Sequence, residues 1–447
     1  IGSYSLEQPE IKNKFNIEYR FLRQSGEKLA SSMDDPVIIG FSCYVWNYRG
    51  SLAFAKAAKE AFPKVKIVLG GYSVPKEFHK LEDYFRTHPY VDALIHGEGE
   101  IAFRDFLLSE LSGSDFTNIK GITVKCDDFQ PGFFSNIEPN RLKNLNELPS
   151  PFLNGTFAEI MATYGDKVTG ALWETNRGCP YSCTFCDWGN SDVSKISQYS
   201  LERLEAEINW IGKNNFYFMF FGDANFGIFK ERDMQIAELI VKARDKYGAP
   251  LHVGTNWAKN KGEWVVAIAD RMARGSISSN ITMALQSTNP ETLKVIKRKN
   301  LEGGKVGQLK SLFHERYIPT YVELILGLPL ETYETFSAGL NQILSNRLED
   351  RFLVYLCQLL ENTELASQES RELYKLESKF CKHSVSNRKL EYSDENYEYE
   401  EFVIATSTMS IDMWLKSYTL AYFLTVLYNH RSAFFLLIFL REHFGQL

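Results

Sequence analysis

The chain has 447 residues, which is enough for two or three domains with a sizeable core. Hydrophobic residues make up 44%, and the formal net charge of −6 argues against a nucleic-acid-binding surface, which is usually basic. The seven cysteines contain one tight cluster, at 179–186, rather than an even set of pairs. This usage favours a reducing, cytoplasmic compartment over a disulfide framework.

Residues 36–125 alternate short apolar runs with helical patterns. Such alternation is typical of an α/β protein with an open, parallel, doubly wound sheet. We therefore assign residues 1–138 to a Rossmann-like domain, with a helix before Pro36. Its strands are expected at 37–42, 65–69, 93–95 and 119–124, and its helices at 52–62, 78–87 and 102–111.

Three loops follow the first three of these strands. Ligands bind at the carboxyl ends of the strands in such sheets, and glycine lets a backbone approach a large flat ligand closely. The alternative is that the glycines only make tight turns between strand and helix. The candidate residues are Ser42, Tyr44 and Trp46 in the first loop, Gly70, Gly71, Tyr72 and Val74 in the second, and Gly97, Glu98 and Gly99 in the third.

Residues 139–167 contain prolines and little periodicity, so they are interpreted as a linker. Strands and helices then alternate again over 168–360, which predicts a partial parallel (β/α)6 barrel with its chemistry at the carboxyl ends of the strands. The six strands are expected at 168–174, 216–221, 251–256, 280–286, 319–326 and 352–356, and the five helices at 201–213, 233–247, 263–274, 290–297 and 332–344.

Residues 361–447 are expected to form a mostly helical C-terminal domain. Their most apolar stretch, 418–440, is interrupted by Asn429, His430 and Arg431. A membrane span needs about 20 continuous apolar residues, so we expect two packed core helices here and no membrane partner.

The loop after the first barrel strand contains Cys179, Cys183 and Cys186 at C-x-x-x-C-x-x-C spacing. Thiolates are soft ligands suited to iron–sulfur clusters, copper or zinc. Three of them can hold three corners of a 4Fe–4S cube and leave one iron open to an amine and a carboxylate. A zinc site usually needs a second pair of ligands, and none follows at the usual distance. Three structural cysteines are the remaining alternative.

This loop resembles that of the radical S-adenosylmethionine (SAM) superfamily, and the resemblance covers about residues 168–360. Phe185 stands just before the last cysteine, where the family packs an aromatic residue near the adenine. The resemblance implies a 4Fe–4S cluster on the three cysteines and SAM on the open iron. It also implies an external electron donor, such as flavodoxin or ferredoxin, for cleavage of the sulfonium C–S bond.

The same resemblance implies further contacts to SAM. Gly222, Asp223 and Ala224 stand where the family often has Gly-Gly-Glu, whose backbone carbonyls bind the SAM amino group. Gln286 and Ser287 end the fourth strand, where the family holds the ribose and the carboxylate.

Leu326 and Gly327 match the family's glycine-bearing strand beside the adenine. Arg298 either pairs with the SAM carboxylate or is one solvated charge in a short basic run. Glu323 faces either the helix layer or the barrel lumen, and Cys357 either approaches substrate or is inert packing.

The three loops of the first domain together resemble the cobalamin-binding domain that precedes the barrel in one class of radical SAM enzymes. Gly70, Gly71 and the run 96–100 carry this resemblance best. The D-x-H-x-x-G motif that supplies a histidine to cobalt in many cobalamin domains is absent, so we expect cobalamin without a histidine ligand. Trp46 either covers the lower face of the ring and excludes water or is a packed loop anchor.

The two resemblances imply a cobalamin-dependent radical SAM methyltransferase. A 5′-deoxyadenosyl radical would take a hydrogen atom from an unactivated carbon of a small-molecule or peptide natural product, and methylcobalamin would supply the methyl group. One alternative is a cyclisation, rearrangement or epimerisation without methyl transfer. From another class, the chain could be a cofactor-binding sensor without turnover.

Overall fold

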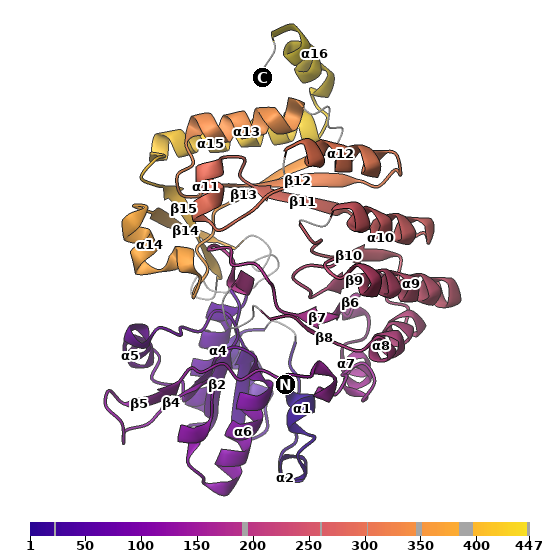
Figure 1. Cartoon of the computed structure of the whole chain (residues 1–447). Helices are drawn as coiled ribbons and strands as arrows, with labels where there is room; N and C mark the ends of the chain where they lie inside the picture. The colour runs from indigo at the N-terminus through magenta and orange to yellow at the C-terminus, as the bar shows by residue number, and fades with distance from the viewer. Residues whose placement is uncertain are drawn as a thin grey trace. The chain divides into compact units, whose positions relative to one another are not determined.

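The computed structural model is an α/β structure made of two compact units (Figure 1). The first unit contains Ile1–Pro149, Leu359–Ser367 and Phe380–Glu401, and the second contains Ser150–Gln358, Gln368–Lys379 and Phe402–Leu447. The structure describes residues 1–21, 24–189, 195–259, 262–301, 303–345, 351–383 and 397–444.

The first unit is built on a five-stranded sheet in the order β1-β2-β3-β4-β5. β1 (Ile38–Ser42), β2 (Lys66–Gly70) and β3 (Ala93–Ile95) are parallel, as expected. β4 (Ile122–Lys125) and β5 (Phe133–Asn136) are antiparallel to their neighbours, so the expectation of a fully parallel sheet is wrong at this edge. The chain enters β4 at the edge of the sheet where the parallel strands end, and after β4 it turns back into β5.

Helices cover both faces of this sheet. α3 (Gly26–Ser31), α4 (Tyr48–Ala61) and α5 (Phe78–Thr87) pack on one face through a core that includes Ile67 and Leu81. α6 (Gly99–Ser112) packs on the other face, in a second core cluster. Helices on both faces are the doubly wound arrangement that the sequence predicts.

Before Pro36, short helices stand where one helix was expected. Besides α3 these are α1 (Gly2–Ser5) and α2 (Pro9–Lys12). The Arg104 guanidinium of α6 donates a hydrogen bond to the Tyr4 hydroxyl over 2.9 Å, which holds α1 to the sheet layer.

The second unit contains two three-stranded parallel sheets. β6 (Gly170–Trp173), β9 (Phe218–Phe221) and β10 (His252–Gly254) form one, in the order β10-β9-β6. The other is formed, in that order, by β11 (Ile281–Gln286), β12 (Thr320–Leu326) and β13 (Arg351–Leu356). A parallel bridge joins His252 of β10 to Ser278, which lies just before β11. Six parallel strands in sequence order are the predicted partial barrel.

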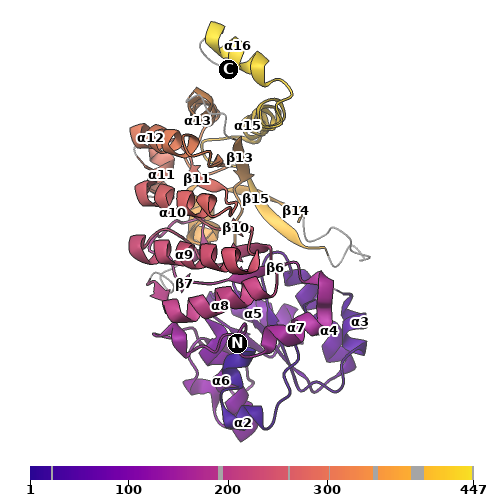
Figure 2. The ribbon, with the colours of Figure 1, turned by 90° about the vertical axis from the view of Figure 1, so that its right-hand side faces the viewer.

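Helices cover the outer face of these strands, and Figure 2 shows several of them stacked in a row. α8 (Leu201–Lys213), α9 (Lys230–Tyr247), α10 (Gly262–Arg274) and α13 (Tyr333–Ser345) match predicted helices closely. α11 (Pro290–Val295) is shorter than expected, and α12 (Gly303–His314) was not predicted. The remaining elements before β9 are α7 (Thr156–Tyr164), β7 (Asn176–Arg177) and β8 (Ser197–Gln198).

The region after β13 contains strands as well as helices. α14 (Gln368–Leu373) precedes a pair formed by β14 (Glu377–Lys382) and β15 (Tyr399–Ala405). α15 (Ile411–Leu424) and α16 (Phe434–Phe444) confirm the two expected helices, but α16 is not a core helix because Leu437 is its only buried residue. In the described part of the chain no single helix is long and apolar enough to cross a membrane. One pair bent by 113°, Ile411–Asn429 with Phe434–Phe444, passes that test of length and composition only when taken together.

Candidate active site

A cavity of about 620 Å³ lies within the strands of the second unit. Its volume is in the range of small-molecule sites in proteins. Side chains from β9, β11, β12 and β13 line it, together with the loop that follows β10 and the cysteine loop that follows β7. The cavity therefore joins the lumen of the partial barrel to the cysteines.

All three cysteines of the predicted cluster line this cavity, as does Phe185. Cys179 and Cys183 are buried and Cys186 is half-buried, and none of the three forms a disulfide. Burial raises the pKa of the Cys186 thiol, while Lys259 lowers it. No group of three or more described His, Cys, Asp or Glu side chains is gathered closely enough to hold one metal ion. A 4Fe–4S cube needs no such convergence, because each thiolate ligates a different iron.

The entry to the cysteine loop is anchored by Asp223. This carboxylate is fully buried and accepts hydrogen bonds from both the amide and the hydroxyl of Thr175, the amide one at 2.7 Å. It also accepts bonds from the backbone amide of Asn176 at 3.2 Å and from its side-chain amide at 2.9 Å. Burial raises the pKa of Asp223 to about 7, although the Thr175 bonds act to lower it. Thr175 and Asn176 immediately precede the loop, so Asp223 fixes where the loop starts.

Gly222, Asp223 and Ala224, which stand where the family often has Gly-Gly-Glu, do not all face the cavity. Ala224 lines the cavity, whereas Gly222 and Asp223 are not among its lining residues. The carbonyl of Asp223 accepts a hydrogen bond from the Asn256 side chain at 3.2 Å. The side-chain amide of the adjacent Asn225 donates a hydrogen bond to the Cys179 sulfur at 3.2 Å, a contact that no sequence motif predicts.

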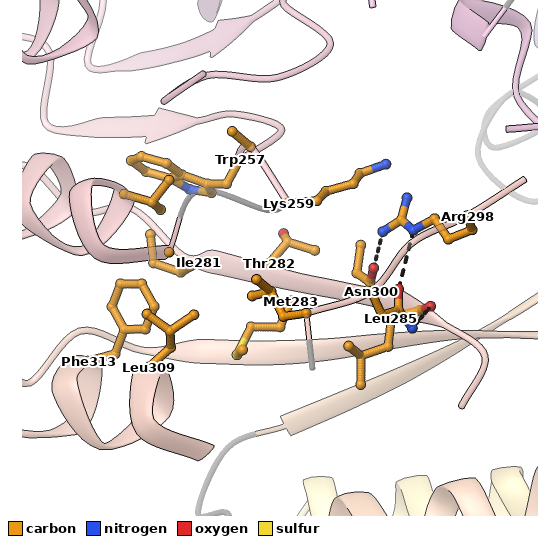
Figure 3. Close-up of a pocket in the computed structure, with 15 residues that line it drawn as sticks. Trp257, Lys259, Ile281, Thr282, Met283, Leu285, Arg298, Asn300, Leu309 and Phe313 are labelled. Atoms are coloured by element: carbon orange, nitrogen blue, oxygen red, sulfur yellow. Dashed lines mark hydrogen bonds between the residues drawn. The ribbon is translucent and has the colours of Figure 1, made fainter. Parts of the chain in front are cut away.

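Two cationic side chains line a smaller cavity of about 40 Å³, drawn in Figure 3, and one of them, Lys259, also lines the larger cavity. The Lys259 ammonium and the Arg298 guanidinium point toward one another there. Burial lowers the pKa of Lys259, Arg298 lowers it further, and the cysteine thiols oppose this shift. Lys259 was not predicted, because no motif in the sequence marks it.

Arg298 is buried, with 6% of the residue exposed, so its interpretation as one solvated charge is wrong. One terminal nitrogen donates to the Ala284 carbonyl, and Nε donates to the Asn300 side chain at 3.4 Å (Figure 3). The other terminal nitrogen is buried without a partner, as is Oε1 of Gln286 on the cavity wall. Unsatisfied buried polar atoms are costly, so both atoms are suited to binding a polar ligand. The residues present therefore fit a cluster with SAM beside it.

Glu323 faces the barrel lumen, which decides the alternative that the sequence left open. It lines the cavity beside Tyr321 and Tyr355, and the Tyr321 hydroxyl accepts a bond from Thr282 at 2.6 Å. Burial raises the pKa of Glu323, while Lys259 and Arg298 lower it.

Other predicted residues of this unit point elsewhere. The Ser287 hydroxyl binds the Glu331 carboxylate, and neither Leu326 nor Gly327 lines the cavity. A Cβ on Gly327 would lie 3.1 Å from the Val403 carbonyl, so this glycine permits close packing against β15. Cys357 is buried beside it with a pKa raised to about 12 by burial, which favours inert packing over approach to substrate.

The three candidate loops of the first unit follow β1, β2 and β3 at the carboxyl edge of its sheet. The Gly70 carbonyl, at the end of β2, accepts a bond from the Cys43 amide, beside Ser42, at 2.6 Å. Gly71 has a φ of +99°, and a Cβ there would lie 2.5 Å from the Cys43 carbonyl, so the first two loops touch through their backbones. Gly97 has a φ of +70° and open space around its Cα.

The aromatic residues of these loops form a small stack. Trp46 is half exposed and stacks on Tyr44 with ring centroids 4.6 Å apart, and Tyr72 meets Tyr44 edge-on at 6.0 Å. Val74 is fully buried in the core, so its side chain supports the loop from beneath. Glu98, at the N-terminus of α6 beside Gly99, accepts a bond from the Arg141 guanidinium at 2.7 Å.

Comparisons with known proteins define the class. The fold is similar to that of the radical SAM methyltransferase TsrM from Kitasatospora setae, with a TM-score of 0.63 and 15% identity over 89% of this chain and 81% of that one. It is also similar to the cobalamin-dependent radical enzyme OxsB, with a TM-score of 0.61 and 16% identity over 90% of this chain and 60% of that one. The fold is that of the cobalamin-dependent radical SAM enzymes.

Residues 173–341 match the family described as the Radical SAM superfamily, which confirms the predicted resemblance. The chain is 36% identical over 430 residues to the "Cobalamin-dependent radical SAM methyltransferase TokK" of Streptomyces tokunonensis, covering 95% of this chain and 62% of that protein. It is 34% identical to the "2-(S-pantetheinyl)-carbapenam-3-carboxylate methyltransferase" of Streptantibioticus cattleyicolor, covering 99% of this chain and 64% of that protein. The chain thus spans less than two thirds of the length of both relatives.

Proposed function

We propose that this chain is a cobalamin-dependent radical SAM methyltransferase that methylates an unactivated carbon. The observation that carries the proposal is the cavity of the second unit, which brings the three cysteines together with the unpartnered Oε1 of Gln286. The unpartnered guanidinium nitrogen of Arg298 lies in the smaller cavity, which shares Lys259 with the larger one. The relatives support methyl transfer, since both are named as methyltransferases. One of them is named for a small carboxylate-bearing molecule, which favours a small-molecule substrate over a peptide here.

The chain's own residues bind and orient the cofactors and exclude water. Cys179, Cys183 and Cys186 would hold the 4Fe–4S cluster, and Gln286 and Arg298 would bind the polar groups of SAM. The loops after β1, β2 and β3 would bind cobalamin at the carboxyl edge of the first sheet. When bound, the cluster and SAM supply a hydrogen-abstracting radical and the cobalamin supplies the methyl group. The protein contributes positioning and a cavity sheltered from solvent.

Phe185 lines the cavity beside the cysteines, where it is suited to pack on the adenine, and Ala224 closes the same wall. Glu323 and its neighbours Tyr321 and Tyr355 line the same cavity and are available to a substrate. An external electron donor such as flavodoxin or ferredoxin, and a reducing cytoplasmic setting, belong to this proposal because the cluster must be reduced before SAM is cleaved.

The test is an anaerobic assay of the reconstituted protein with SAM carrying a deuterated methyl group. We expect 5′-deoxyadenosine together with transfer of the label to a candidate carbapenam carboxylate, followed by mass spectrometry. Deoxyadenosine with a changed but unlabelled product would overturn methyl transfer in favour of a cyclisation, rearrangement or epimerisation. Cofactor binding without deoxyadenosine would instead indicate a sensor.

A further inference from the structure

The helix that follows the first loop begins without a side-chain cap of its own. Its N-cap residue, Asn47, makes no side-chain bond to the helix and instead donates to the Ser42 carbonyl at 2.8 Å. The backbone amides of Arg49 and Gly50 donate to the carboxylate of Glu398, at 2.9 and 3.0 Å. Glu398 is fully buried. A carboxylate in this position satisfies amides that the helix leaves open and interacts favourably with the helix dipole.

The second loop is held in a similar way by Asn362. The Asn362 side-chain amide donates to the carbonyls of Tyr72 and Val74, both at 2.9 Å. Its side-chain oxygen accepts a bond from the Lys76 amide at 3.0 Å. One side chain thus satisfies three backbone groups of a loop that contains no regular secondary structure.

The two loops are also tied to each other. The Cys43 amide donates to the Gly70 carbonyl at 2.6 Å, and the Ser73 amide donates to the Cys43 carbonyl at 3.2 Å. The two loops therefore form one hydrogen-bonded unit. Glu398 binds the start of α4, which follows the first loop, and Asn362 binds the second loop. Asn362 follows β13 and Glu398 immediately precedes β15, so both come from chain that lies beyond the barrel strands.

We propose that Asn362 and Glu398 are positioning residues for cobalamin, which hold the first two loops of the first unit in the conformation that receives the corrin. The inference rests on the proposed function, because it takes these loops as the cobalamin site. A large flat ligand contacts many loop atoms at once, so ordering the loops beforehand reduces the entropy lost on binding. Neither residue needs to touch the cofactor for this effect.

The test compares two substitutions of Asn362 that keep its backbone conformation. Asn362 has a φ of +67°, a left-handed value that glycine and aspartate tolerate better than alanine does. Asn362→Gly removes all three bonds, whereas Asn362→Asp keeps the size but cannot donate to Tyr72 and Val74. Asn215→Gly is the matched control, since Asn215 is exposed and has a φ of +58°.

The measurements are the dissociation constant of hydroxocobalamin, hydrogen exchange of amides 70–76, iron content and the thermal midpoint. Both Asn362 variants should bind hydroxocobalamin about tenfold more weakly, since about 1.4 kcal/mol of lost ordering corresponds to that factor. Their loop amides should exchange faster, while their iron content and thermal midpoint should equal those of the Asn215→Gly control. A merely structural role would lower the thermal midpoint and iron content as well, and would not single out the loop.

Glu398→Gln provides an independent arm, because glutamine keeps one acceptor oxygen but loses the charge and one bond. We expect hydroxocobalamin to bind about threefold more weakly. A negative charge at a helix N-terminus contributes from a few tenths of a kcal/mol to about 1 kcal/mol, and a threefold change in affinity lies within that range. Glu334→Gln, on the exposed face of α13, is its control.

The outcomes separate this proposal from the proposed function. Unchanged binding and unchanged loop exchange in both Asn362 variants would overturn the positioning role and leave the methyltransferase proposal standing. A parent protein that retains no hydroxocobalamin would overturn both. Weaker binding with faster exchange confined to the loops would support both.

Discussion

The cysteine loop and the loops after β1 and β2 are stabilised in different ways. Asp223, which follows the end of β9, anchors the start of the cysteine loop. It accepts four hydrogen bonds from the adjacent residues Thr175 and Asn176. The first two loops of the first unit depend on backbone bonds between themselves and on single side chains from far along the chain. The first arrangement depends on one carboxylate 47 and 48 positions from its partners, whereas the second depends on one amide and one carboxylate that lie 286 to 349 positions from theirs. Changes in the two regions should therefore have separable effects on iron and on cobalamin.

The largest expected effect is that of removing the cysteines. Replacing Cys179, Cys183 and Cys186 together by Ala should abolish both iron binding and deoxyadenosine formation, since no other ligand set remains in the loop. Hydroxocobalamin binding should be unchanged, because the loops of the first unit are held independently. Iron analysis and chromatography of the reaction check this, with Cys126→Ala as the control. Deoxyadenosine formation at the parent rate would contradict the cluster assignment.

Asp223→Asn should have the next largest effect. Asparagine places an amide group against backbone donors, so buried hydrogen-bonding groups lose their partners at a cost of about 1–3 kcal/mol each. We expect the apoprotein to melt at a lower temperature and to take up less iron on reconstitution, with hydroxocobalamin binding intact. Asp245→Asn, on the exposed surface of α9, serves as control. Full iron uptake by Asp223→Asn would show that the loop needs no such anchor.

Asp223 also predicts a pH dependence. Burial raises its pKa from 3.8 to about 7, so the native protein holds this proton more tightly than the unfolded chain does. The contribution of Asp223 to the free energy of unfolding therefore falls as pH rises from about 4 to about 7 and is constant above that range. The thermal midpoint of the parent apoprotein, measured relative to Asp223→Asn, should decline over this range. If the thermal midpoint of the parent rose with pH relative to that of Asp223→Asn, the pKa of Asp223 would be lowered rather than raised in the native protein.

Asn225→Ala should leave the cluster assembled but alter its redox behaviour. The Asn225 amide donates to the Cys179 sulfur, and hydrogen bonds to ligating sulfurs are one determinant of cluster reduction potential. Loss of this donor should shift the potential to a more negative value, measured by titration followed with electron paramagnetic resonance. Asn209→Ala is the control, since that amide binds only a carbonyl of its own helix. An unchanged potential would indicate that the contact is not made in the holoprotein.

The smallest expected effect is that of Trp46→Ala. Trp46 stacks on Tyr44 and is half exposed, so its removal uncovers the first loop without breaking a backbone bond. Hydroxocobalamin should bind a fewfold more weakly and with a changed visible spectrum, because water gains access to cobalt. Phe78→Ala, an exposed aromatic of the same unit, is the control. An identical spectrum would favour the interpretation of Trp46 as a loop anchor.

The sequence predicts most strands and helices well because their signals are local. The strand at Ala93–Ile95 and the helices at Phe78–Thr87 and Leu201–Lys213 have the expected bounds. The cysteine spacing likewise indicates the site directly. The helix at Gly303–His314 was missed because three glycines lower its helix propensity, and burial of its Leu309 and Phe313 compensates. The direction of β4 cannot be deduced from alternation alone.

The supporting residues could not be predicted for a different reason. Asp223, Asn362 and Glu398 act through bonds to backbone groups that are far away in the sequence. The separations are 47 and 48 positions for Asp223, 290 for Asn362 and 349 for Glu398. No local pattern marks such partners, and the types Asp, Asn and Glu are common on any surface. The lumen-facing Lys259 was missed for the same reason, since its significance depends on the strands that surround it.

The discontinuity of the first unit has a consequence for biosynthesis. Its sheet is encoded by the first 149 residues, but Leu359–Ser367 and Phe380–Glu401 belong to the same unit. Domains generally fold as units while the chain leaves the ribosome, N-terminal first. Here the sheet emerges long before Asn362 and Glu398 are synthesised, so the loops after β1 and β2 acquire these supports only after the barrel strands have been translated. A nascent chain arrested before Leu359 should therefore bind hydroxocobalamin less tightly than the released protein does.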